Sequence, residues 1–92
     1  MDYYIIEYED SGILTSVRFK ATTAIEALSK FYAQVSSKND IGVKYISRAD
    51  TIKEAIELFH RLGNIYYIYI ANIYTLGDWI YCTEKADDSD EN

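Results

Sequence analysis

The chain has 92 residues, of which 49% are hydrophobic, and it contains one cysteine, one histidine and no proline, with a formal net charge of −6. This length suits a single domain, and one cysteine excludes both an internal disulfide and a cysteine-rich metal site. No apolar run approaches the roughly 20 residues of a membrane helix. The first residues also lack the basic start and apolar stretch of a secretory signal. We therefore expect a cytoplasmic protein that does not bind membranes.

The negative charge is concentrated near the C-terminal end. Residues 84–91 hold five acids against one lysine, and the rest of the chain has ten acids and eight bases. We predict one folded α+β domain over residues 1–85 and a disordered acidic tail over residues 86–92. Because the predicted domain has little net charge, it is not expected to bind nucleic acid directly.

The first predicted element is a β-hairpin. The turn dipeptide Ser11-Gly12 separates two β-rich runs, residues 3–9 and 13–21. Closing the hairpin on this dipeptide places the apolar side chains on one side, namely Tyr4, Ile6, Tyr8, Val17 and Phe19. The other side carries four charges, Glu7, Glu9, Arg18 and Lys20. Their positions predict cross-strand charge pairing on a solvated face, rather than acid–base chemistry.

Two Thr-x-x-Glu motifs predict the capped starts of two helices. The first runs from Thr23 to Glu26 and the second from Thr51 to Glu54, and apolar residues at helical spacing follow each motif. Between these helices, the run Val43 to Arg48 is typical of a strand. The two segments align without a gap at an offset of 28 residues. Either a duplicated strand–helix unit or the shared rules for starting an amphipathic helix explain this alignment.

The stretch from residue 65 to 83 is rich in isoleucine and tyrosine. A turn at Gly77-Asp78 predicts a terminal hairpin, whose first arm holds one strand or two. A short helix over residues 70–79 is the alternative. The complete prediction is an α+β fold with a small sheet of about five strands and two helices on one face, in the order β-β-α-β-α-β-β.

No group of residues indicates catalysis. His60 and Cys82 lie on different predicted elements, and we expect a surface helix residue and a half-buried strand cysteine. The four glycines are isolated, so no phosphate-binding loop is expected. We therefore predict a protein that is not an enzyme, with no cofactor and no metal.

The ten tyrosines are the unusual feature of the composition. Alternation along a strand sends neighbouring tyrosines to opposite sides of the sheet, while the predicted helices shelter one side only. Tyrosine suits interfaces because it buries much area and keeps a polar group. The simpler explanation is strand propensity combined with an AT-rich coding bias. The predicted contact residues are Tyr3, Ile5, Tyr67, Tyr69 and Trp79.

We therefore expect a non-enzymatic protein-binding module, whose partner is another protein or a second copy of the chain as a homodimer. It would act through the aromatic sheet face opposite the helices or through the edge of the terminal hairpin. In composition alone, the chain resembles short phage or mobile-element proteins, including inhibitors of host effectors. The alternative is an acidic decoy that occupies a nucleic-acid-binding groove, in which Glu7, Glu9, Asp10 and the tail would stand in for phosphates.

Overall fold

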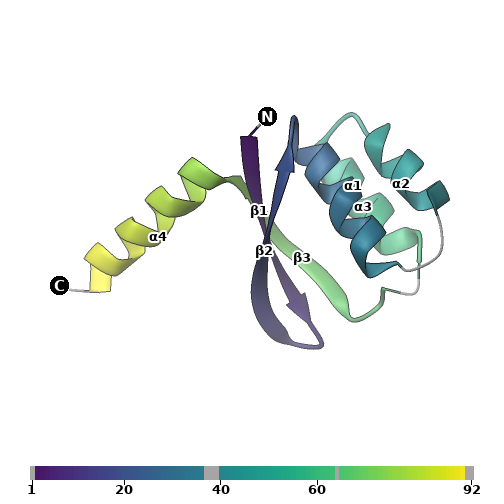
Figure 1. The fold of residues 1–92 in the computed structure, drawn as a ribbon. Coiled ribbons are helices and arrows are strands. Elements are labelled where there is room, and N and C mark those ends of the chain that lie inside the picture. Colours follow the sequence, from purple (N-terminus) through teal and green to yellow (C-terminus); the bar gives the residue numbers. More distant parts are fainter. Residues whose placement is uncertain (1, 37–39, 64, 91–92) are drawn as a thin grey trace.

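A computed structural model describes residues 2–36, 40–63 and 65–90 of the chain. Three antiparallel strands form one sheet in the order β2-β1-β3. Helices α1, α2 and α3 lie on one side of this sheet, and α4 leaves the end of β3 on the other side (Figure 1). The elements are β1 (Asp2–Asp10), β2 (Ile13–Ala21), α1 (Ala24–Val35), α2 (Asp40–Ser47), α3 (Ile52–Arg61), β3 (Ile68–Thr75) and α4 (Leu76–Asp90).

The predicted first hairpin is confirmed, including its register. Asp10 pairs with Ile13 at the turn, and Tyr4 pairs with Phe19 further along the strands. Ser11 and Gly12 have φ values of 53° and 86°. Two successive residues with positive φ are what a two-residue turn between twisted strands requires. The hairpin therefore follows from its turn residues and from the alternation of its side chains.

Both predicted helix caps are confirmed. The backbone N–H of Glu26 donates to the Thr23 hydroxyl oxygen, and that of Glu54 donates to the Thr51 hydroxyl oxygen, each at 3.1 Å. In a capping box the glutamate accepts from the backbone N–H of the cap residue, but here each glutamate accepts from the residue before the cap. The backbone N–H groups of Thr22 and Asp50 donate to them at 2.9 Å. The hydroxyl and backbone N–H of Thr22 also hold the pKa of Glu26 below its usual value.

Removing the second cap should weaken the fold by a measurable amount. We expect Thr51→Ala to lower the free energy of unfolding by about 1 kcal/mol, because the N–H of Glu54 loses its acceptor. Urea denaturation measures this change. Thr51→Ser is the matched control and should retain most of the stability, since it keeps the hydroxyl. Equal losses in both variants would show that the cap bond does not contribute.

The predicted five-stranded sheet with two helices is wrong, since the element order is β-β-α-α-α-β-α. The run from Val43 to Arg48 lies mostly in helix α2. Its apolar residues Val43 and Ile46 are three apart and face the core, so the helical period prevails over the alternating one. Of the two explanations for the alignment at an offset of 28 residues, the duplicated strand–helix unit is therefore also wrong, because a helix precedes α3 where a strand precedes α1.

The predicted terminal hairpin is wrong as well. Its first arm becomes β3, and the segment that was to turn back begins helix α4 at Leu76. The Thr75 hydroxyl oxygen accepts a hydrogen bond from the backbone N–H of Asp78 at 3.2 Å, as at a helix N-cap. This Thr-x-x-Asp pattern is the signal that sequence reasoning missed. Helix α4 continues to Asp90 and so includes most of the predicted tail. The disorder of this tail stays a prediction, and its residues 91–92 lie outside the described residues.

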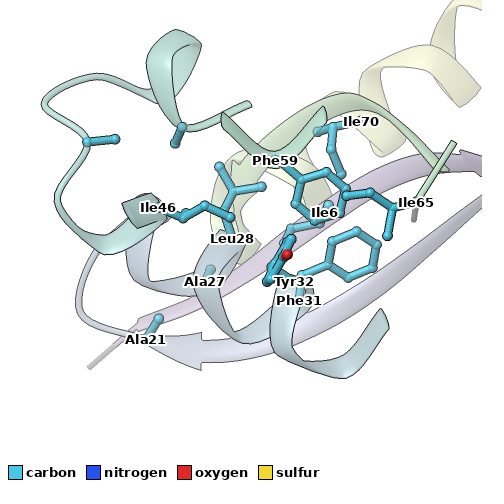
Figure 2. Close-up of a cluster of buried hydrophobic side chains, with 12 residues drawn as sticks. Ile6, Ala21, Ala27, Leu28, Phe31, Tyr32, Ile46, Phe59, Ile65 and Ile70 are labelled. Carbon is cyan, nitrogen blue, oxygen red and sulfur yellow. The ribbon is translucent and has the colours of Figure 1, made fainter. Parts of the chain in front are cut away.

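The core lies between α1, α2, α3 and one face of the sheet (Figure 2). Phe31 is fully buried, and its ring stacks on Phe59 with centroids 5.4 Å apart. Tyr32 is also buried, and its hydroxyl donates to the backbone oxygen of Leu62 at 2.9 Å, near the end of α3. The aromatic residues of α1 thereby join the first hairpin to α3.

Candidate interaction surface

The sheet face away from α1 is partly covered, because α4 contacts β1 and β3 on that side. Ile5, whose neighbours across the sheet are Arg18 and Tyr74, is only 4% exposed. Burial raises the pKa of Tyr74, and the nearby Glu7 and Cys82 raise it further. The structure thus places the predicted contact residue Ile5 inside the fold, where a partner cannot reach it.

Tyr3 lies on the same face and is 41% exposed. Two cations lie over its ring: the Arg18 guanidinium is 5.5 Å and the Lys20 ammonium 5.9 Å from the ring centroid. The cross-strand charge pairing predicted for Glu7 and Glu9 is therefore replaced by contacts between cations and an aromatic ring. In the described ranges, the salt bridge that forms joins Lys30 and Glu26 on α1.

Three tyrosines at and just before the start of β3 form the most exposed aromatic group. Tyr66, Tyr67 and Tyr69 are 82%, 73% and 62% exposed, and we call them the tyrosine patch. The backbone beneath them is held in place, since the N–H of Ser11 donates to the Tyr67 carbonyl at 2.8 Å. The Tyr69 ring lies 5.5 Å from the ring of His60 on α3. These exposed rings therefore lie on a segment whose backbone is hydrogen-bonded to the β1–β2 turn.

Sequence reasoning selected Tyr67 and Tyr69 for the sheet face opposite the helices or for the edge of a terminal hairpin, and it left out Tyr66. Alternation was expected to send Tyr66 and Tyr67 to opposite sides of the sheet. Both residues precede β3, which begins at Ile68, so alternation does not govern them. The signal that could have identified Tyr66 is the absence of charge around it, since Asp78 is the single charged residue between Arg61 and Glu84.

Trp79 lies on α4, where it is half-buried, while its neighbours Ile80 and Tyr81 are 42% and 62% exposed. Helix α4 begins at the far end of β3 from the tyrosine patch. An eight-residue strand spans about 26 Å. The structure therefore does not bring Trp79 together with Tyr67 and Tyr69.

His60 and Cys82, the two residues considered for catalysis, also lie on different parts of the fold. His60 is an exposed residue near the end of α3, as predicted, whereas Cys82 is an exposed residue of α4 and not a half-buried strand residue. These helices lie on opposite sides of the sheet (Figure 1). A cleft of about 380 Å³ at the junction of β1 and α4 is lined by Asp2, Tyr3, Thr75, Leu76 and Gly77. Over residues 2–36, 40–63 and 65–90, acidic, histidine and cysteine side chains form no group of three that could hold a metal ion.

Comparisons with protein-family models, with curated proteins and with solved structures match nothing for this chain. Among the described helices, none is long and apolar enough to cross a membrane.

Proposed function

We propose that this protein is a non-enzymatic binding module that docks another protein on the tyrosine patch. The observation that carries the proposal is the exposure of Tyr66, Tyr67 and Tyr69, which is 62% or more for each. A covered aromatic side chain buries about 150–250 Å², so three rings at these exposures offer roughly 300–550 Å². An apolar surface of this size, about 300–600 Å² on a typical monomer, is often functional.

The chemistry around the patch favours a protein partner over a nucleic acid. Aromatic rings that stack on bases work beside lysine and arginine side chains, which neutralise the phosphates. Here no lysine or arginine occurs between Arg61 and Lys85. Tyrosine side chains are instead typical of the central contacts in protein interfaces. An inhibitor that covers a working surface of a host effector is the most concrete form of this proposal.

The test is binding by patch variants. We expect Tyr66→Ser and Tyr67→Ser each to weaken binding at least tenfold, as loss of a central aromatic contact does. The partner is first captured from extract of the native host and purified, and dissociation constants are then measured by calorimetry. Tyr45→Ser is the matched control, because Tyr45 is 50% exposed but lies on α2, and its binding should match that of the unmodified protein.

Two results would contradict this assignment. Patch variants that keep every interaction of the unmodified protein would show that the tyrosines are not the docking surface. Loss of binding on deletion of residues 86–92, with a steep dependence on salt, would instead support the acidic decoy.

A further inference from the structure

The two edges of the sheet are not equivalent. The outer edge of β3 is irregular, with a register shift opposite Glu7 and Tyr8. Two of its backbone N–H groups already have acceptors: that of Ile73 donates to the Asn72 side chain at 2.9 Å, and that of Ile68 donates to the Ile65 carbonyl at 3.1 Å. Such features discourage pairing with another strand.

The outer edge of β2 has no register shift, and the side chain that bonds to its backbone is Lys30, at the carbonyl of Lys20. The nine residues of β2 all pair with β1, and the strand contains no proline. Because Asp10 and Ile13 close a two-residue turn, Ile13 and every second residue after it bond to β1. The N–H and C=O groups of Leu14, Ser16 and Arg18 therefore point outward. In the described ranges, no backbone partner lies beyond β2.

We propose that β2 pairs antiparallel with β2 of a second copy of this chain, which joins two three-stranded sheets into one. Full overlap of the strands places Val17 opposite Val17 of the second copy and Ser16 opposite Arg18 of the second copy. In this register the outward groups meet each other, as an antiparallel ladder requires. The ammonium of Lys30 already donates a hydrogen bond to the outward carbonyl oxygen of Lys20. That oxygen has a second lone pair, which can accept from the new strand.

The charges of the two copies are complementary in this register. Within one chain, Glu7 lies beside Ser16 and Glu9 lies beside Leu14. Across the new junction, Arg18 of one copy is therefore separated from Glu7 of the other by the small Ser16 alone. Lys20 is separated from Glu9 of the second copy by Leu14 in the same way. All of these side chains share the face away from α1, so each cation lies two strand spacings from a carboxylate that forms no salt bridge with the described residues of its own chain.

The junction also covers apolar surface. Val17 and Phe19 face the core side but are only half-buried, and Ile13 and Leu14 are 71% and 61% exposed. Pairing sets the two Val17 side chains against each other and Phe19 against Thr15 of the second copy. Because a single strand edge is a small interface, we expect a dissociation constant of about 1–100 μM.

This self-pairing is separate from the proposed docking function, because it uses the outer edge of β2, whereas the tyrosine patch belongs to the start of β3 at the other edge of the sheet and reaches the β1–β2 turn through the Ser11–Tyr67 backbone hydrogen bond. A dimer joined at β2 carries the two patches at its outer ends, where it can hold a partner with two sites more tightly than a monomer can. Tyr66→Ser should therefore leave the dimer intact, so failure of either proposal can be recognised without the other.

The first test is sedimentation equilibrium on the full chain from about 5 μM to 1 mM. We expect a concentration-dependent dimer, and we expect Ser16→Lys to raise its dissociation constant at least tenfold by placing a lysine opposite Arg18 of the second copy. Ser16→Ala is the matched control and should dimerise like the unmodified chain. Ser16 is exposed and lies on the outer edge, so circular dichroism should show the same fold in all three proteins. A chain that stays monomeric at 1 mM would overturn the proposal.

The second test fixes the register by exchanging charges between copies. One variant carries Arg18→Glu with Lys20→Glu, and the other carries Glu7→Lys with Glu9→Lys. We expect each variant to be monomeric alone and the mixture to form a heterodimer, which a Ser16→Pro change in both copies abolishes by removing the outward N–H. A mixture that remains monomeric, or a heterodimer that survives Ser16→Pro, would overturn the proposed pairing.

Discussion

Replacing Phe31 with alanine is expected to lower the free energy of unfolding by about 3–5 kcal/mol. Phe31 is fully buried at the centre of the core (Figure 2), and its ring contacts three other aromatic rings. Tyr8, Phe59 and Phe19 have centroids 4.7, 5.4 and 6.2 Å away. Alanine would leave a cavity bordered by β1, β2 and α3. The loss of stability therefore cannot be relieved by moving a single element into that cavity.

Urea denaturation, followed by circular dichroism, measures this loss. A domain of 92 residues has about 5–14 kcal/mol of stability in total, so the variant should be partly unfolded in water if the protein lies near the lower limit. Tyr45→Ala is the control, since it removes an aromatic ring that is 50% exposed and should cost much less. Similar losses in the two variants would show that the four rings do not form the centre of the core.

Local chemistry accounts for the parts of the fold that the sequence predicted correctly. The hairpin depends on Ser11-Gly12 and on alternation, and two helix starts depend on Thr23 and Thr51. Each of these signals acts within a few residues. The Thr75 cap is the same kind of signal, but the β-rich residues before it directed the prediction toward a hairpin.

The parts that could not be predicted depend on contacts between distant segments. Helix α2 packs against α1 and α3 and not on the sheet, and nothing within residues 43–48 indicates this. The exposure of the predicted contact residues likewise depends on contacts between distant segments. The sequence identified Tyr67 and Tyr69 as candidates, but Ile5 is buried in a strand that α4 contacts, and α4 was expected to be a strand. Alternation identifies the side of a strand, whereas exposure depends on which element covers that side.

The second large effect is expected at Gly42, in helix α2. A Cβ atom at this position would lie 2.5 Å from the hydroxyl oxygen of Tyr32 and even closer to its ring carbons. The ring cannot easily move away, because it packs against Phe59 and its hydroxyl donates to Leu62 at the end of α3. Overpacking costs about 1–3 kcal/mol, and loss of the hydrogen bond adds about 1 kcal/mol. These costs exceed the gain of about 1 kcal/mol from alanine's helix propensity.

We therefore expect Gly42→Ala to destabilise the protein by about 1–3 kcal/mol in urea denaturation. Gly77→Ala is the matched control, because Gly77 also lies in a helix but a Cβ there has open space around it. It should stabilise by about 0.5–1 kcal/mol, with the opposite sign. In a Tyr32→Leu background, Gly42→Ala should lose most of its penalty, since the ring that opposes the Cβ is absent. If both glycine variants shift stability in the same direction, close packing of Tyr32 on α2 does not explain why a glycine is needed at position 42.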